Sequence, residues 1–165
     1  MVALTGEELQ KWVEHISDSW KKLLTAHPEI LSFACDIREA QSVAHVLQHI
    51  VAAELRFAER LNELEQTPYE SISFDSVEAI YTTHDRAMEL LRPLLERDAK
   101  WWEEVLVIQT RSAGTLRASR RTLLVHVLTH SIRHYAQLAT LVRQHGVKHD
   151  LVADYLLMGL AQPVG

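Results

Sequence analysis

Residues 119–146 read SRRTLLVHVLTHSIRHYAQLATLVRQHG, and this stretch decides the fold because it carries a complete helix signature. Ser119 has the kind of side chain that caps a helix N-terminus, and Gly146 is the kind of residue that ends a helix. Side chains recurring at steps of three and four form one inward stripe, which consists of Leu123, Val127, His130, His134, Leu138 and Leu141. A helix from Ser119 to His145 would be about 40 Å long.

Three more segments show the same amphipathic pattern. The first opens at Thr5, where Glu8 completes a capping box, and it ends at His27, because a residue before proline avoids the helical conformation. The third has Pro93 just beyond its end, where proline can kink or stop a helix. The helices are expected from Thr5 to His27, from Ser42 to about Glu65, and from about Asp75 to Leu91.

Two further segments are shorter. Residues 101–118 contain a β-branched run, Val105–Ile108, and a turn-like sequence at Ser112–Gly114, so we expect a short hairpin or an extended loop there. Residues 150–160 are expected to form a short fifth helix. The sequence therefore predicts an all-α protein with one domain over residues 1–165. Its architecture would be a four-helix bundle with a short extra C-terminal helix and a small hairpin before the last long helix.

Composition disfavours several classes of protein. The chain has 165 residues, of which 47% are hydrophobic and 24% are charged, and its formal net charge is −5. An acidic chain lacks the basic footprint of a nucleic-acid binder. The single cysteine, Cys35, excludes an internal disulfide framework and is interpreted as a small buried residue. Because no secretory signal and no apolar run of about 18 residues is visible, we expect a soluble cytoplasmic protein that does not bind a membrane.

Histidine is unusually frequent, with ten in the chain. His126, His130 and His134 recur at steps of four on the last long helix, and His45 and His49 repeat that spacing on the second. Residues four apart lie on one helical face with Cβ atoms about 5–6 Å apart, so two imidazoles can reach one metal ion. One such pair is a weak signal, because histidines on a helix often only hydrogen-bond a neighbour.

His49, His130 and His134 carry the stronger indication. Each occupies a position in an inward stripe whose other members are Leu, Val, Ala and Phe. Burying an imidazole without a polar partner costs about 1–3 kcal/mol, so three of them in one core need a common explanation. A shared divalent metal ion, with three His ligands and one open coordination position, is the simplest explanation.

Two segments resemble the DinB-like superfamily. Residues 46–61, VLQHIVAAELRFAERL, resemble its second-helix signature, and residues 123–146 resemble its last long helix, where a His-x-x-x-His pair is followed by Gln. The resemblance implies a four-helix bundle, frequently a homodimer, with a three-His site for a divalent metal ion. By position its ligands fall on His49, His130 and His134. The resemblance implies zinc or nickel most often, with iron, cobalt or manganese as alternatives.

The resemblance is incomplete after the third ligand. Many members have Arg-Gly-Gln there, whereas this chain has Tyr135-Ala136-Gln137. Gln137 and His126 are interpreted as residues that contact the ligands or line the pocket, and His45 is the counterpart of His126 on the second helix. If the register of the two helices slipped by one turn, His45 and His126 would pair instead.

Other charged residues receive structural interpretations. Glu54 follows His49 by five residues and lies about 140° around the helix from it, so we expect an ion pair with an arginine on a neighbouring helix. A basic cluster before the last long helix is interpreted as a solvated loop, with an anion site as the alternative. This cluster consists of Arg111, Arg117, Arg120 and Arg121.

Three hypotheses for the function follow. In the first, the protein is an enzyme whose metal ion activates a thiol or water toward a small-molecule substrate, although no further catalytic residue is indicated. The resemblance supports it, because relatives include S-transferases and isomerases that use bacillithiol, mycothiol or glutathione, and others are described as hydrolases. In the second, the protein is a non-catalytic metal-binding or stress-response bundle that acts through its dimer surface. The third, a DNA-associated factor, is disfavoured by the net charge of −5.

Overall fold

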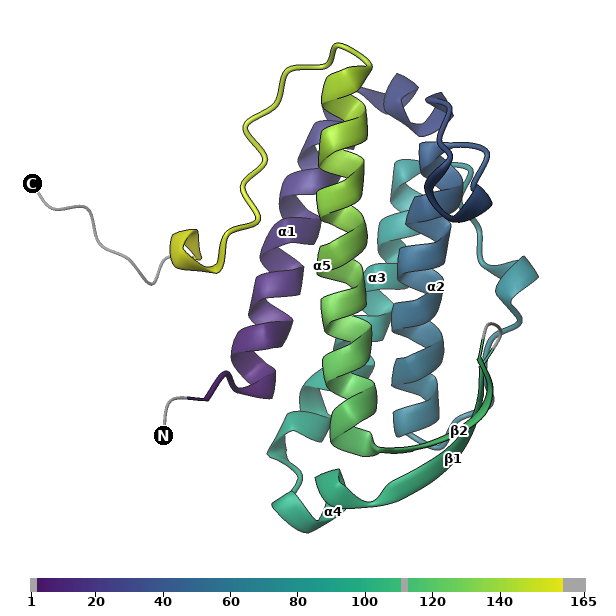
Figure 1. Ribbon diagram of the computed structural model, residues 1–165, viewed down its shortest axis with the longest axis vertical. Coiled ribbons are helices and arrows are strands. Elements are labelled where there is room, and N and C mark those ends of the chain that lie inside the picture. Colours follow the sequence, from purple (N-terminus) through teal and green to yellow (C-terminus); the bar gives the residue numbers. More distant parts are fainter. Residues whose placement is uncertain (1–2, 111–112, 159–165) are drawn as a thin grey trace, which may run out of the picture.

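Four long helices form the body of the molecule (Figure 1). The computed structural model describes residues 3–110 and 113–158. The long helices are α1 (Gly6–Ala26), α2 (Val43–Leu61), α3 (Val77–Leu91) and α5 (Arg120–Gln144). Both α1 and α2 pack against α3 and against α5, so the four helices close a ring around a shared core. The predicted four-helix bundle is confirmed.

Local side-chain hydrogen bonds explain where three of the four long helices begin. Thr5 and Glu8 form the predicted capping box, in which each side chain accepts from the backbone N–H of the other. Ser119 caps α5 as predicted, since its hydroxyl accepts from the N–H of the third residue of the helix. α3 begins after Ser76, which caps it in the same way, close to the start predicted at about Asp75.

The second long helix ends earlier than predicted, at Leu61 rather than near Glu65. The side-chain amide of Asn62 donates to the carbonyl of Leu90 at the end of α3. Glu63 then adopts a left-handed backbone conformation, with φ of 59°, which a helix cannot accommodate. The end of α2 is therefore set by a contact with another helix, which the local sequence does not reveal.

A β-hairpin precedes α5, as predicted. The short helix α4 (Ala99–Glu103), which the sequence did not predict, leads into strand β1 (Val105–Thr110), and β1 pairs antiparallel with β2 (Gly114–Ser119). Gly114 has a positive φ of 69°, which glycine adopts without steric strain. Ile108 is the buried side chain of β1. In Figure 1 the hairpin rises beside α2 and so forms a side wall of the bundle.

The predicted C-terminal helix is much shorter in the part of the chain that the structure describes. Instead of a helix over residues 150–160 there is one 3-10 turn, Tyr155–Leu157, and positions 159 and 160 lie outside the described residues. Two leucines of the turn are exposed, so no packed apolar face stabilises a longer helix. The segment is attached to α1 instead, because the indole N–H of Trp12 donates to the carbonyl of Ala153 at 2.8 Å.

Arg120 is buried at the start of α5, contrary to the predicted solvated loop. Only 2% of it is exposed. Its guanidinium group donates to the carbonyl of Leu61 at 3.1 Å and to the carboxylate of Glu63 at 2.7 Å. It also lies over the ring of Trp101, 4.4 Å from the centroid. Arg120 thus joins the ends of α2 and α5 to the short helix α4.

The core inside the four helices is mainly apolar. Trp20 of α1 stacks on Tyr135 of α5, with ring centroids 5.7 Å apart. A smaller set of buried polar side chains interrupts the apolar packing, and it includes Ser17, Glu54, His84 and Ser131. Among the described residues, no helix has the length and apolar character that a membrane span requires.

Candidate metal centre

Three histidines from two neighbouring helices meet at one point. His49 comes from α2, and His130 and His134 come from α5. One ring nitrogen of each lies within 4.8 Å of the other two. The Nε2 atoms of His49 and His130 are 3.0 Å apart, and the rings of His130 and His134 have centroids 4.5 Å apart. The structure therefore brings together the three residues that the sequence analysis selected as ligands.

Burial keeps His130 and His134 uncharged near neutral pH. His130 is 8% exposed and His134 is 1% exposed, whereas His49 is half-buried. Burial, together with the neighbouring His134 and His49, lowers the pKa of His130 to about 2. Burial is also the main reason that the pKa of His134 is lowered. A neutral imidazole has a free lone pair on one nitrogen, and this is the form that binds a metal ion.

Gln137 fixes the orientation of His134. The Nδ1–H of His134 donates to Oε1 of Gln137 at 2.7 Å, about one helical turn further along α5. Because Nδ1 then carries the proton, Nε2 has the lone pair, and it accepts from Nη2 of the exposed Arg133 at 3.2 Å. Histidines that bind metals usually have such a partner on the second nitrogen, since it sets the tautomer and the ring angle.

The donor set fits a divalent metal ion. Nitrogens about 2.0–2.1 Å from a tetrahedral zinc ion are about 3.3 Å apart. The ring nitrogens, which lie within 4.8 Å of one another, would therefore move by up to about 1.5 Å to hold the ion, and Nη2 of Arg133 would leave Nε2 of His134. The Nδ1 atom of His130 is buried and has no hydrogen-bond partner among the described residues. Three imidazoles leave one coordination position for a substrate or water, and they suit zinc, nickel, cobalt or iron.

His45 and His126 lie near the cluster but outside it. A ring nitrogen of His45 hydrogen-bonds the hydroxyl of Ser42 at 2.8 Å, at the start of α2. His126 packs on Phe57, with ring centroids 5.5 Å apart. Both histidines line the cavity described below, but neither belongs to the group of converging nitrogens. The alternative register, in which His45 pairs with His126, is not the register of the structure.

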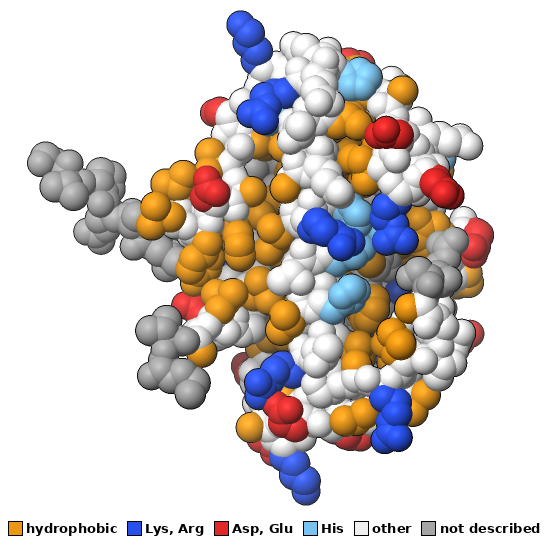
Figure 2. Space-filling model, in the orientation of Figure 1, with side chains coloured by type: hydrophobic (Ala, Val, Ile, Leu, Met, Phe, Trp, Pro, Cys, Tyr) orange, Lys and Arg blue, Asp and Glu red, His pale blue; other side chains and the backbone are white. Residues whose placement is uncertain are grey.

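The three histidines lie in the wall of a cavity of about 710 Å³. α2 and α5 form one side of it, and Gln109, Thr110 and Leu116 of the hairpin contribute to another. Figure 2 shows His side chains together with Lys or Arg side chains near the centre of this face of the molecule. Ligand pockets typically measure about 300–1,000 Å³, so the cavity can accept a small organic molecule beside the histidines.

The arginines of this cavity were not predicted as site residues from the sequence. Arg56 and Arg60 of α2 line it together with Phe57. Arg56 follows His49 by seven residues and Arg60 by eleven, which is close to two and three helical turns. That spacing places them on the face of α2 that carries the histidine ligand, and it could have been read from the sequence.

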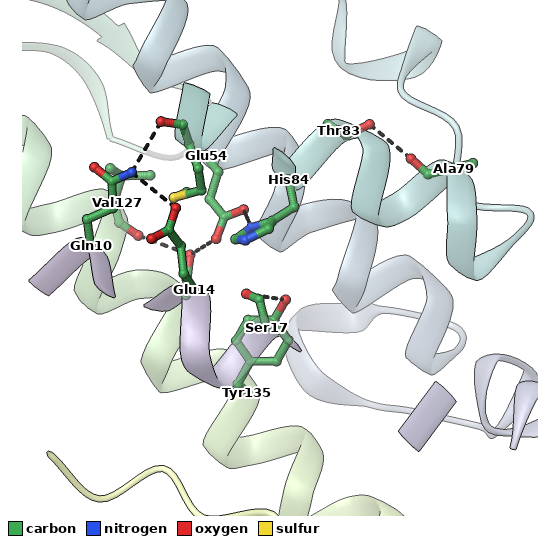
Figure 3. A network of polar contacts seen from close by, with 11 residues as sticks. Gln10, Glu14, Ser17, Glu54, Ala79, Thr83, His84, Val127 and Tyr135 are labelled. Atoms are coloured by element: carbon green, nitrogen blue, oxygen red, sulfur yellow. Dashed lines mark hydrogen bonds and ion pairs between the residues drawn. The ribbon is translucent and has the colours of Figure 1, made fainter. Parts of the chain in front are cut away.

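Glu54 binds a buried histidine and a serine rather than the predicted arginine (Figure 3). Its fully buried carboxylate accepts from Nδ1–H of His84 and from Oγ of Ser131, both at 2.7 Å. Burial alone lowers the pKa of His84, but the charge and hydrogen bond of Glu54 outweigh it, and the pKa of His84 is raised. The contact joins α2, α3 and α5 close to the histidine cluster, since Ser131 follows His130 in α5.

The remaining residues selected from the sequence do not belong to the cluster where the structure describes them. Arg121 forms a surface ion pair with Glu103, and Arg117 is exposed on β2. Arg111 lies outside the described residues. Cys35 is buried as predicted, and burial raises the pKa of its thiol, which makes it a poor nucleophile.

The fold and the site define a helical bundle with a three-histidine centre, and comparison with known proteins identifies the family. The model of the DinB family matches residues 1–160, and the chain belongs to this family. A crystal structure of the DinB-like protein YjoA from Bacillus subtilis is similar, with a TM-score of 0.60 and 17% sequence identity over 86% of this chain and 94% of that chain. At this identity the likeness shows the fold alone. No curated protein matches the chain.

Proposed function

We propose that the protein is a metal-dependent enzyme that acts on a small molecule, with His49, His130 and His134 as ligands of one divalent ion. The observation that carries the proposal is the convergence of three imidazoles in the wall of an open cavity. A structural zinc site is usually closed by four protein ligands, whereas this cluster offers three and adjoins space for a substrate. Zinc or nickel is the proposed ion.

The chain's own residues have three tasks in this proposal. Gln137 holds the ring of His134 so that Nε2 faces the site. The contact of Glu54 with Ser131 fixes the turn of α5 that carries His130. The hairpin forms one side of the cavity. The bound divalent ion would supply a Lewis acid that lowers the pKa of a thiol or of water.

We favour a thiol over water as the nucleophile. The described residues that line the cavity include no Asp or Glu, so no carboxylate is positioned there as a general base for water. A thiol has a pKa of about 8.5, against 15.7 for bulk water, and therefore needs far less assistance to ionise. The superfamily that the sequence resembles includes thiol-dependent transferases, which supports the same choice.

The test is a conjugation assay with untagged protein reloaded with zinc or nickel. Glutathione, bacillithiol and mycothiol are each offered with a chloronitrobenzene as the electrophile, and consumption of the thiol is followed. We expect activity that a chelator abolishes, that added metal restores, and that His130→Ala lacks. His145→Ala is the matched control, because His145 is an exposed histidine outside the cluster.

Failure of the assay would separate the two main hypotheses. Metal-loaded protein that consumes none of the three thiols contradicts the transferase proposal. If the same protein still binds one metal ion through the three histidines, the non-catalytic metal-binding bundle becomes the better account. The homodimer stays a prediction, and sedimentation of the untagged protein would test it.

A further inference from the structure

The cavity beside the histidines carries only positive formal charge among its described residues. Its lining includes Arg38, Arg56, Arg60 and Arg133 and no Asp or Glu. The whole chain, in contrast, has a formal net charge of −5. A cleft lined by one sign of charge concentrates ligands of the opposite sign. The cavity is therefore suited to an anion, although the protein is acidic.

Arg56 and Arg60 have no carboxylate partner within ion-pair distance among the described residues. Other arginines of this chain do pair with acidic side chains. Those that form ion pairs are Arg86, Arg92, Arg120 and Arg121. The charges of Arg56 and Arg60 are thus left uncompensated in a partly buried place, where an unpaired charge is more costly than at the surface.

Neutral groups hold these two guanidinium groups in place. Arg56 donates to the carbonyl of Thr67. Arg60 donates to Oε1 of Gln66 at 2.9 Å and to the carbonyl of Gln109 in β1 at 3.2 Å. These contacts use some of the five N–H donors of each guanidinium group and leave others free for a ligand. They orient the two cations without neutralising them.

The two cations also affect each other, and an aromatic ring lies between them in the sequence. Arg56 and Arg60 are one turn apart on α2, a spacing at which like charges destabilise a helix. Burial, and then the charge of Arg56, lowers the pKa of Arg60. The guanidinium carbon of Arg60 lies 5.2 Å from the ring centroid of Phe57. An anion held by both arginines would offset their repulsion and would have an apolar surface beside it.

We propose that the cavity binds a small molecule with a carboxylate or phosphate group, which Arg56 and Arg60 hold by charge-assisted hydrogen bonds while its apolar part contacts Phe57. The rise of 1.5 Å per residue places Arg56 about 10 Å along α2 from His49, so a molecule of about that length extends from the arginines to the histidines. Only the placement of the other end of this molecule at the histidines rests on the proposed function. The anion site itself stands on the arginines.

The competing explanation is that the two arginines only attach the segment after α2 to the bundle. Calorimetric titration of the untagged full chain with phenylacetate, phenyl phosphate and neutral phenylacetamide separates the two. We expect at least one anion to bind at least about tenfold more tightly than the amide, a difference of about 1.4 kcal/mol. Binding of that anion should weaken as the salt concentration is raised. The carboxylate and phosphate probes show which oxyanion the site prefers.

Two variants test whether Arg56 and Arg60 bind the anion. Arg56→Gln and Arg60→Gln should each weaken binding of the preferred anion about tenfold or more, because each removes a charged donor. The control Arg143→Gln changes an exposed arginine in the last turn of α5. Its affinity for the anion should stay within about twofold of that of the unmodified protein. If circular dichroism shows that a variant folds poorly, NMR of the unmodified protein gives the same answer. The Nε–H signals of Arg56 and Arg60 should both shift when the anion is titrated in.

The outcomes keep this inference separate from the proposed function. His130→Ala should lose metal but retain anion binding. If the unmodified protein binds the anion and no metal, the proposed function fails and the anion site stands. Equal affinity for the anions and the amide, or unchanged binding in both Arg56→Gln and Arg60→Gln, overturns the anion site whatever the metal content.

Discussion

The hydrogen bond from His134 to Gln137 lets a single residue orient one imidazole of the three-histidine cluster. Replacing Gln137 with Ala removes the acceptor, so the ring of His134 can change its tautomer and rotate. Loss of such a partner typically lowers metal affinity about 10–100-fold. We expect a decrease of that size for zinc in Gln137→Ala, measured by competition with a chromophoric chelator.

Two further variants make this prediction specific. Gln137→Glu keeps an acceptor at the same place and should retain zinc affinity at least as high as that of the unmodified protein. Gln144→Ala changes an exposed glutamine at the end of α5 and should have no effect. Unchanged affinity in Gln137→Ala would mean that packing alone orients His134.

The buried pair of His84 and Glu54 makes stability depend on pH. Burial lowers the pKa of His84, but Glu54 raises it further, so the folded pKa lies above the ordinary value of 6.5. A group whose pKa is higher in the folded state than in the unfolded state stabilises the fold fully at pH values below its unfolded-state pKa. This stabilisation is lost as the pH rises through the folded-state pKa. The free energy of unfolding in urea should therefore fall as pH is raised from about 6.5.

The variant His84→Gln isolates this contribution. It cannot titrate, so its stability should lack the part of the pH dependence that His84 causes. The informative quantity is the difference between the two proteins in urea unfolding at each pH. A difference that stays constant above pH 6.5 would contradict the account of His84 as a protonated partner of Glu54.

Single residues show both the value and the limit of helical geometry. The rotation of about 140° correctly separated Glu54 from the ligand face of α2. Its partner was predicted wrongly as an arginine, because the neighbour of a buried residue depends on which helix lies opposite. The structure places His84 of α3 and Ser131 of α5 there.

At the scale of elements, Arg120 holds three of them together. Arg120→Ala would leave the carbonyl of Leu61 without its donor and would uncover Trp101. A buried polar group that loses its partner costs about 1–3 kcal/mol. We expect the free energy of unfolding to fall by about that amount, measured by urea denaturation.

The neighbouring Arg121 provides the matched control. Its ion pair with Glu103 lies on the surface, where such pairs contribute about 0–1 kcal/mol. Arg121→Ala should therefore be close to neutral in the same denaturation experiment. Equal losses in the two variants would show that burial of Arg120 does not stabilise the junction of α2, α4 and α5.

The ends of elements differ in how far the sequence predicts them. The starts of α1 and α5 follow from capping side chains within the same segment, Thr5 with Glu8 and Ser119, and both predictions are confirmed. The end of α2 depends on the bond from Asn62 to Leu90 of another helix, and the prediction was wrong. The C-terminal helix was overpredicted because its leucines stay exposed in the described turn.

At the scale of the whole molecule, the bundle and the histidine cluster were predictable for the same reason. A period of 3.6 residues converts spacing in the sequence into position on a helical face. Together with the resemblance to the DinB-like superfamily, this selected His49, His130 and His134. The same conversion does not give the depth of the cavity or the place of the hairpin beside α2. Those depend on how separate elements pack, so the cavity emerged only from the structure, although the helical face of Arg56 and Arg60 could have been read from the sequence.

The metal content of untagged protein, determined by elemental analysis, tests the central claim most directly. We expect about one divalent ion per chain after purification or after reloading with zinc or nickel. The ion should be lost in His49→Ala, His130→Ala and His134→Ala and retained in His45→Ala, whose histidine lies outside the cluster. Protein that binds no metal after reloading, or that keeps it in all three ligand variants, would contradict the account.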